Sequence, residues 1–162
     1  MIQGCNPPMD CVGCLWASAL ATELTVDQVE RLFNRVEVRE LSKNEILISE
    51  GDDDDRLYAI VKGEFVIYQT DSRGQESPAR IGSGTITSEL AFLDGPKRTA
   101  TVKAENDKCC VIGLRRDQLE TLLSDDPILV YKVMRAVVRS AHQTVGNDGV
   151  LGADGLIART AH

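Results

Sequence analysis

The 162-residue sequence has no long apolar run, no basic excess and almost no histidine. No stretch approaches the roughly 18 consecutive apolar residues that mark a membrane-spanning helix, so we expect no membrane span. The N-terminus lacks the basic and apolar regions of a secretory signal, which predicts a cytoplasmic protein. A formal net charge of −7 argues against a nucleic-acid partner, because such binding begins with a basic surface.

The sequence also offers no pair of a nucleophile and a neighbouring base. Its histidines are His142, which falls on a long predicted helix, and His162, which ends the chain. Nucleophilic or acid–base catalysis needs such groups within hydrogen-bonding reach of one another. We therefore do not expect an enzyme.

A run of carboxylates occupies residues 50–55, Glu-Gly-Asp-Asp-Asp-Asp. Clustered carboxylates can bind calcium, but the glycine and the terminal glutamate of an EF-hand loop are missing from their required positions. Charge runs of this kind are ordinarily solvated. We predict an exposed acidic hairpin turn rather than a calcium site.

The chain is long enough, and with 43% hydrophobic residues apolar enough, to bury one core. We divide it into a cysteine-containing N-terminal segment, residues 1–24, a folded domain, residues 25–145, and a flexible tail, residues 146–162. The tail is rich in glycine and has little apolar pattern, which is typical of mobile segments. Pro7-Pro8 predicts an extended or turning segment rather than a helix near the N-terminus.

Runs of strand-forming residues predict an antiparallel sheet structure through the middle of the domain. The predicted strands cover residues 46–48, 57–62, 64–68, 99–102 and 109–114. Gly63 supplies the backbone freedom for a tight hairpin, and an amphipathic helix over residues 25–33 opens with Thr25 and Gln28 in a capping arrangement. The predicted fold class is mainly β with flanking helices: an antiparallel jelly-roll β-barrel with an N-terminal helix and a long C-terminal helix.

Residues 82–102 combine a glycine turn, a short helix, a second turn and a strand. Ser88 is a good N-cap for a helix that begins at Glu89 and ends within about two turns at the Asp-Gly-Pro of residues 94–96. The N–H groups of its first turn, together with the forked donors of Arg98, suit an anion. Because the carboxylate of Glu89 accepts hydrogen bonds from hydroxyls, a ribose phosphate would use both groups.

Ser-Glu-Leu-Ala-Phe-Leu at residues 88–93, followed by Lys-Arg-Thr-Ala-Thr-Val at residues 97–102, resembles the phosphate-binding cassette of cyclic nucleotide-binding domains. These domains occur in catabolite-activator-like (Crp/Fnr-type) regulators, in kinase regulatory subunits and in gated channels. The resemblance implies cyclic AMP or cyclic GMP as the ligand. It covers residues 25–145, and we expect no DNA-binding domain in this chain.

The resemblance also assigns binding residues. It implies that Glu89 holds the ribose 2′-hydroxyl, that Arg98 holds the cyclic phosphate, and that the amides of Leu90 and Ala91 complete the phosphate cradle. Thr99 is similar to the hydroxyl that some cyclic-GMP-preferring members place against the base.

Two residues depart from the family's pattern: Ser88 stands where glycine is usual, and Thr87 where an aromatic residue is usual. The hydroxyl of Ser88 either adds a hydrogen bond to the phosphate or brings a Cβ that crowds the ligand. Because a cassette can persist as fold without ligand, a domain that binds no nucleotide is an alternative.

Residues 127–145 form the longest helical pattern, which opens with Pro127. Its apolar residues are spaced by three or four positions, as in a coiled-coil seam: Val130, Met134, Val137, Ala141 and Val145. In catabolite-activator-like proteins the equivalent helix covers the nucleotide and dimerises the protein, which implies a homodimer. The alternative is a helix that packs only on its own barrel. Tyr131 and Arg135 are candidates for contacts with the base.

The N-terminal cysteines offer soft metal ligands. Three cysteines are one ligand short of a tetrahedral zinc site or a four-cysteine iron–sulfur cluster, and Cys109 and Cys110 are the candidates for the fourth. Oxygen-sensing relatives of the catabolite activator, of the fumarate–nitrate-reduction type, ligate a four-iron cluster with three N-terminal cysteines and one on a later strand. With different spacings, the set here resembles theirs: Cys5, Cys11, Cys14 and Cys110.

We favour the simpler interpretation that no metal binds. The Glu89–Arg98 pair, which cluster regulators do not need, is intact, and nothing in the sequence shows that the N-terminal segment folds back to the strand that carries Cys110. Either Cys109 or Cys110 is then expected in the core, and the three N-terminal cysteines are expected to react readily with thiol reagents.

The sequence therefore predicts a stand-alone regulatory module that senses cyclic AMP or cyclic GMP and signals through an effector protein. Two alternatives stay open. One is a redox or oxygen sensor that carries an iron–sulfur cluster on its N-terminal cysteines, and the other is a docking subunit of a larger assembly that binds no ligand.

Overall fold

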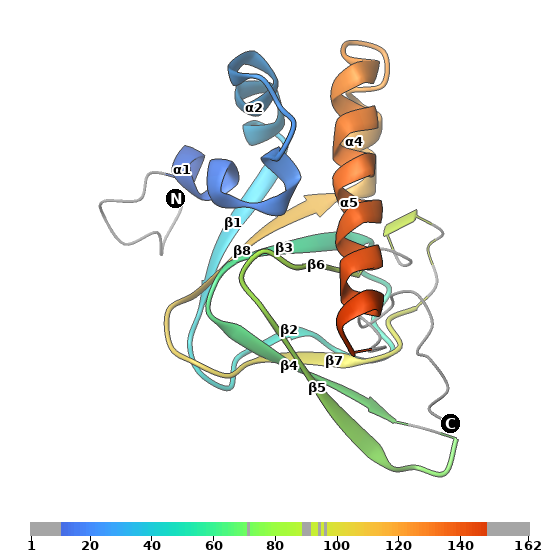
Figure 1. Ribbon diagram of the computed structural model, residues 1–162. Coiled ribbons are helices and arrows are strands. Elements are labelled where there is room, and N and C mark those ends of the chain that lie inside the picture. The colour runs from blue at the N-terminus through green and yellow to red at the C-terminus, as the bar shows by residue number, and fades with distance from the viewer. Residues whose placement is uncertain (1–10, 71, 89–91, 94, 96, 149–162) are drawn as a thin grey trace.

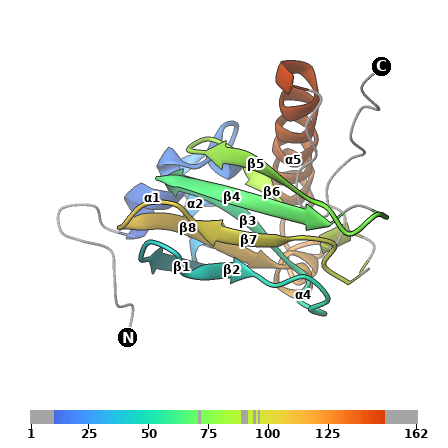
Figure 2. The same cartoon turned by 90° about the horizontal axis from the view of Figure 1, so that it is seen from below.

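The computed structural model describes residues 11–70, 72–88, 92–93, 95 and 97–148, and for residue 11 and residues 143–148 it describes the backbone alone (Figure 1). The strands form two four-stranded antiparallel sheets, with the orders β1-β8-β3-β6 and β2-β7-β4-β5. In Figure 1 the first sheet lies above the second, and the helices lie on the outer side of the first. In the turned view of Figure 2, α1 and α2 lie toward one end of the strands and α4 toward the other.

The strands are β1 (Val36–Leu41), β2 (Ile46–Ile48), β3 (Arg56–Lys62), β4 (Glu64–Thr70), β5 (Glu76–Gly82), β6 (Ile86–Thr87), β7 (Thr101–Ala104) and β8 (Cys109–Arg115). The helices are α1 (Cys11–Ala17), the 3₁₀ helix η1 (Ala19–Ala21), α2 (Val26–Phe33), α4 (Arg116–Glu120) and α5 (Pro127–Asp148). This architecture confirms the predicted antiparallel β fold with an N-terminal helix and a long C-terminal helix. None of the helices in the described part of the chain has both the length and the apolar character that crossing a membrane demands.

The chain turns at Gly63 as predicted, but the predicted hairpin is wrong: β3 pairs with β8 and β6 in the first sheet, and β4 pairs with β5 and β7 in the second, so the turn carries the chain from one sheet to the other. Gly63 has a φ of +89°, and a Cβ at this position would lie 2.4 Å from Sγ of Cys109 and 3.1 Å from its Cα. Both the left-handed backbone and the close approach of β8 therefore require glycine here.

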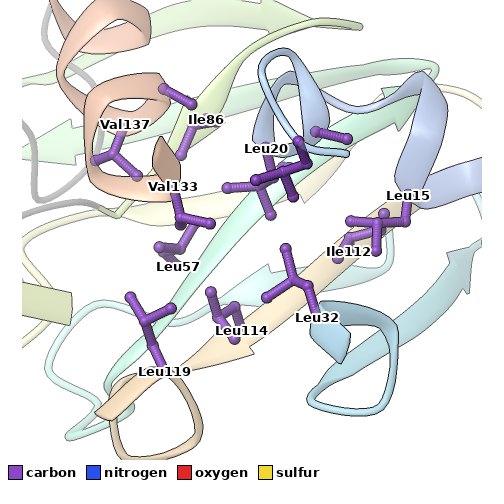
Figure 3. Packing of buried hydrophobic residues seen from close by; sticks show 14 of the residues in the cluster. Leu15, Leu20, Leu32, Leu57, Ile86, Ile112, Leu114, Leu119, Val133 and Val137 are labelled. Carbon is purple, nitrogen blue, oxygen red and sulfur yellow. The ribbon is translucent and has the colours of Figure 1, made fainter. Parts of the chain in front are cut away.

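Strand β8 has both of its faces buried. Cys109 and Val111 belong to the core between the two sheets, whereas Cys110 and Ile112 belong to a second core between the first sheet and the helices. Figure 3 shows this second core, in which side chains from α1, η1, α2, α4 and α5 meet those of β3, β6 and β8. The sequence predicted one buried cysteine in this strand. Both are buried, because the helices cover the face that would otherwise meet solvent.

The N-terminal segment is more ordered than predicted. Residues 11–17 form helix α1, so the predicted extended segment is wrong for these residues, while Pro7-Pro8 lies outside the described part of the chain. Leu15 of α1 is fully buried, and Leu20 and Leu24 join the same core. Residues 11–24 therefore pack as part of the domain that was predicted for residues 25–145, because burial of these apolar side chains stabilises the short helix.

Helix α2 begins with the predicted capping box. The backbone N–H of Gln28 donates to Oγ1 of Thr25 over 3.3 Å, and the backbone N–H of Thr25 donates to Oε1 of Gln28 over 3.1 Å. Oε1 of Gln28 also accepts a hydrogen bond from Nζ of Lys132 over 2.9 Å. One glutamine therefore caps α2 and joins it to α5.

The apolar seam of α5 packs on its own barrel. Val130 and Val137 belong to the helical core, Met134 packs against it, and Ala141 is buried as well, whereas the side chain of Val145 lies outside the described part of the chain. The opposite face leaves three large apolar side chains about 60% exposed: Ile128 (62%), Tyr131 (61%) and Val138 (62%). The seam identified in the sequence is therefore an intramolecular one, and a different face of α5 is open to a partner.

Candidate functional site

Arg98 lies in the loop that precedes β7 and is 2% exposed. Its backbone N–H donates to the carbonyl of Asp52 over 2.9 Å, and its carbonyl accepts from the N–H of Gly51 over 2.7 Å. These bonds join the cassette to the loop between β2 and β3. The sequence placed Arg98 just before a strand starting at residue 99. The strand begins at Thr101, and the backbone of Arg98 is bonded to this loop instead of to a sheet.

The guanidinium of Arg98 is enclosed and faces both a carboxylate and a carbonyl. Its Nη2 lies 3.5 Å from Oδ2 of Asp54 and donates to the carbonyl of Arg56 over 2.5 Å. The Arg98 side chain is 0% exposed and that of Asp54 is 25% exposed. A buried cation needs such compensation, since transfer of an isolated charge out of water is very unfavourable.

Asp54 connects the cassette arginine to β3. Its Oδ1 accepts from the backbone N–H of Arg56 over 3.1 Å and from Nη1 of Arg56 over 3.0 Å, and its Oδ2 accepts from the hydroxyl of Tyr58 over 3.1 Å. Burial alone would raise the pKa of Asp54, but the hydrogen bonds from Arg56, the charge of Arg98 and the Tyr58 hydroxyl together hold it below its ordinary value. Asp54 is therefore an ionised counter-charge for Arg98.

The carboxylate of Asp54 also affects the pKa of Tyr58. Burial, the charge of Asp54 and the hydrogen bond to Asp54 together raise the pKa of Tyr58 to about 12. The phenol thus stays neutral and donates to Asp54. Sequence reasoning missed this role of the acidic run: Asp54 is not part of a purely solvated turn. A carboxylate two residues before a strand that begins with arginine was the available signal.

Ser88 and Thr87 lie at the start of the cassette, and β3 holds this segment too, because Thr87 pairs with Tyr58. Ser88 has a φ of +74°, the left-handed region that glycine favours. Both side chains are fully buried, and Oγ1 of Thr87 and Oγ of Ser88 have no hydrogen-bond partner within the described part of the chain. Buried hydroxyls are ordinarily bonded, so these two are candidates for ligand contacts.

The predicted short helix is described only in part. The carbonyl of Ser88 accepts from the N–H of Phe92 over 3.1 Å, which is the spacing of a helical turn. Glu89, Leu90 and Ala91 lie outside the described residues, so their predicted roles stay predictions. The remaining predicted site residue, Thr99, is exposed beside Arg98.

Helix α5 touches the strand that leads into the cassette. Oγ of Ser140 accepts a hydrogen bond from the backbone N–H of Ile86 over 2.9 Å, and both residues are buried. Sequence reasoning missed this bond, although a small polar residue beside Val137 and Ala141 on the buried face of an apolar helix was a signal for it. Helix α5 is therefore hydrogen-bonded directly to the strand that leads into Ser88.

The two candidates for base contacts on α5 point elsewhere in this arrangement. Tyr131 is 61% exposed, and the guanidinium carbon of Arg135 lies 5.6 Å from the centroid of its ring. Nη2 of Arg135 lies 3.2 Å from Oε1 of Glu23, and Nη1 of Arg139 lies 2.9 Å from the same oxygen. These ion pairs join α5 to the turn between η1 and α2.

The cysteines of the predicted metal set are brought partly together. Sγ of Cys14 and Sγ of Cys110 lie 3.9 Å apart in the helical core, whereas Cys5 and the side chain of Cys11 lie outside the described part of the chain. Among the described side chains, no group of three or more potential metal ligands is found. We expected Cys14 to react readily with thiol reagents, which requires an exposed thiol. Cys14 is only 1% exposed, because α1 folds back onto the strand that carries Cys110, so this expectation is wrong.

Comparison with known proteins agrees with this geometry. The family model of the cyclic nucleotide-binding domain matches residues 38–126. The cAMP-dependent protein kinase regulatory subunit of Mycosarcoma maydis is 31% identical over 85 residues, which cover 52% of this chain and 16% of that protein. The cAMP-activated global transcriptional regulator CRP of Salmonella typhimurium is 26% identical over 137 residues, which cover 82% of this chain and 65% of that protein. The chain thus spans less than two thirds of the length of these relatives.

Solved structures share the fold. A cyclic nucleotide-binding domain from Methylobacillus flagellatus superimposes with a TM-score of 0.73 at 23% identity, covering 84% of this chain and 76% of that one. The N-terminal domain of a transcriptional regulator from Streptomyces coelicolor gives a TM-score of 0.66 at 28% identity, covering 86% of this chain and 99% of that one. The chain belongs to the cyclic nucleotide-binding domain family.

Proposed function

We propose that the protein is a non-enzymatic regulatory module that binds cyclic AMP or cyclic GMP at Arg98 and passes the binding event through α5 to an effector protein. The observation that carries this proposal is the enclosed guanidinium of Arg98, which Asp54 and the carbonyl of Arg56 hold in place. A fixed, desolvated arginine can fork onto two oxygens of a phosphate. Two relatives described above, a cAMP-dependent protein kinase regulatory subunit and a cAMP-activated transcriptional regulator, support the ligand class.

In this proposal each cassette residue has one role. Arg98 binds the cyclic phosphate, Glu89 accepts from the ribose 2′-hydroxyl, and the amides of Leu90 and Ala91 donate to phosphate oxygens. The buried hydroxyl of Ser88 donates to the same phosphate, and the exposed Thr99 is available to the base. The cyclic phosphate carries one negative charge, so it adds to Asp54 as a second counter-charge for Arg98.

The output is proposed to run through Ser140. Ligand contacts displace the segment after Ile86, and its N–H is bonded to Ser140 of α5, so the position of the helix depends on the state of the cassette. The exposed face of α5 then presents Ile128, Tyr131 and Val138, which are spaced by three and seven positions. That spacing is the repeat of a helix–helix interface, and it supports a homodimer or an effector contact on this face.

Calorimetric titration of variants with cyclic AMP and cyclic GMP tests the proposal. Arg98→Ala is expected to weaken binding by about 2–5 kcal/mol, because the phosphate loses its charge partner. Glu89→Gln is expected to lose less, since an amide oxygen still accepts a ribose hydrogen bond. Lys97→Ala is the matched control: Lys97 is the neighbouring cation but is exposed, so its loss is expected to change affinity only a few-fold.

Circular dichroism of each variant separates lost binding from lost folding, and Arg98→Lys, which retains the charge without the fork, provides a milder second test. Binding by Arg98→Ala that equals the wild type would refute the assignment of the phosphate site. If neither nucleotide binds the wild type, the alternative of a docking subunit without ligand is favoured instead.

A further inference from the structure

Two buried thiols from distant parts of the chain meet in the helical core. Cys14 of α1 and Cys110 of β8 are 96 positions apart, yet their sulfur atoms lie 3.9 Å from each other. Cys14 is 1% exposed and Cys110 is 7% exposed, and both are reduced in this structure. Figure 3 labels Leu15, which follows Cys14 in α1, and Ile112, which lies two positions after Cys110 on the same face of β8, and both belong to this core.

The neighbouring Cys109 gives a contrast within the same strand. It is fully buried as well, but it belongs to the core between the sheets. Its thiol donates to the backbone carbonyl of Asn106 over 3.3 Å. Of two adjacent cysteines in β8, only Cys110 therefore faces Cys14.

We infer that Cys14 and Cys110 form a reversible disulfide when the protein meets hydrogen peroxide, and that this bond cross-links α1 to β8. In the first step the thiolate of Cys110, the more exposed of the two, attacks one peroxide oxygen: an S–O bond forms, the O–O bond breaks, and water leaves after protonation. In the second step the sulfur of Cys14 attacks the resulting sulfenic acid, an S–S bond forms and a second water leaves. Each thiol loses its proton and one electron, and the peroxide takes up both electrons.

The position of α1 makes the bond attainable. A disulfide needs sulfur atoms about 2 Å apart, so the two must approach by roughly 2 Å. Strand β8 is held between β1 and β3, whereas α1 is a helix of seven residues that packs on one side. Openings of such a short peripheral element also give the oxidant access to the buried thiols.

The cross-link would fix the helical layer on which α5 rests. Helix α1 leads directly into η1, and Leu20 of η1 lies in the same core as Val133 of α5 (Figure 3). Glu23, which follows η1, pairs with Arg135 and Arg139 of α5. The inference concerns thiol chemistry and does not depend on whether a nucleotide binds.

Two matched variants of the full chain test the inference. One retains only Cys14 and Cys110 (Cys5→Ser, Cys11→Ser, Cys109→Ser), and the other retains only Cys14 and Cys109 (Cys5→Ser, Cys11→Ser, Cys110→Ser). Both are reduced, checked for folding by circular dichroism and treated with hydrogen peroxide. Trypsin cuts after Arg31, Lys108 and Arg115, so mass spectrometry without reductant detects peptide 1–31 linked to peptide 109–115.

The expected result is a link in the first variant that forms about ten-fold faster or more than in the second, because only the first holds its sulfurs in contact. Oxidation should raise the melting temperature of the first variant by about 5 °C or more, and a dithiol reductant should reverse both changes. Three outcomes overturn the inference: equal linkage in the two variants, oxidation to sulfinic acid without a link, or stoichiometric iron or zinc in the purified wild type.

Discussion

Replacing Asp54 with asparagine removes the charge that faces Arg98 and retains the shape of the side chain. The two charged atoms lie 3.5 Å apart, and the arginine side chain is fully enclosed. At an effective dielectric constant of about 20, Coulomb's law gives an attraction of about 5 kcal/mol for this separation. Since Asp54 keeps contact with water and asparagine can still accept from Arg56, we expect a net loss of about 2–4 kcal/mol in the free energy of unfolding.

Thermal unfolding measures this loss. For a chain of this length it corresponds to a fall of about 5–15 °C in melting temperature. Asp55→Asn is the control, because Oδ2 of Asp55 lies 4.0 Å from Nη2 of Arg116 in a pair whose side chains are 36% and 32% exposed. That variant should lose less than about 1 kcal/mol. If Asp54→Asn melts with the wild type, Asp54 is not the counter-charge of Arg98.

The stability of Asp54→Asn relative to the wild type is also expected to depend on pH and on bound nucleotide. Because the folded-state pKa of Asp54 is lowered, its stabilising contribution is complete above the ordinary value of about 3.9 and is lost as the pH falls below it. The difference between wild type and Asp54→Asn should therefore shrink in acid. Under the proposed function, a cyclic phosphate replaces the missing charge, so saturating nucleotide should stabilise Asp54→Asn more than the wild type.

Three further variants test individual contacts. Ser88→Gly relieves a left-handed φ of +74° and deletes a buried hydroxyl, so the free energy of unfolding should rise by about 1 kcal/mol, and a lower urea midpoint would contradict this. Ser140→Ala leaves the N–H of Ile86 without its hydroxyl acceptor and should destabilise the fold by about 1–3 kcal/mol in the same assay, whereas an unchanged midpoint would show that the bond is not formed. Because the pKa of Tyr58 is raised, its contribution to the stability of the fold is complete below about pH 10 and is lost toward pH 12. The stability advantage of wild type over Tyr58→Phe should therefore shrink in that range, and a constant difference would rule this out.

Local chemistry made much of the fold predictable. The capping box of Thr25 and Gln28, the turn at Gly63 and the strands that precede and follow it each depend on residues within a few positions of one another. Such features are visible as spacing and composition in a single sequence. The sequence also showed that Ser88 stands where the family usually has glycine. Its positive φ gives the physical reason for that preference, because glycine adopts the left-handed region without strain.

Contacts between distant segments were not predictable in this way. Asp54 looked like one of several solvated carboxylates, and only the approach of Arg98 from 44 positions later distinguishes it from Asp53. Helix α1 was missed because the predicted extended segment followed from Pro7-Pro8 alone, whereas burial of Cys14 and Leu15 stabilises the helix. Each of these features depends on which partner the fold brings to a residue, and the spacing of residues along the chain does not contain that information.

Titration of the wild-type protein with cyclic nucleotides in a calorimeter tests whether the site around Arg98 binds a cyclic phosphate. Cyclic AMP, cyclic GMP and the ring-opened 5′-monophosphates are compared at the same concentrations. We expect saturable binding of at least one cyclic nucleotide at one molecule per chain, and much weaker binding of the 5′-monophosphates, whose second charge and different shape do not fit a site built around one arginine. Absence of heat and of thermal stabilisation with both cyclic nucleotides would contradict a cyclic-nucleotide site at Arg98.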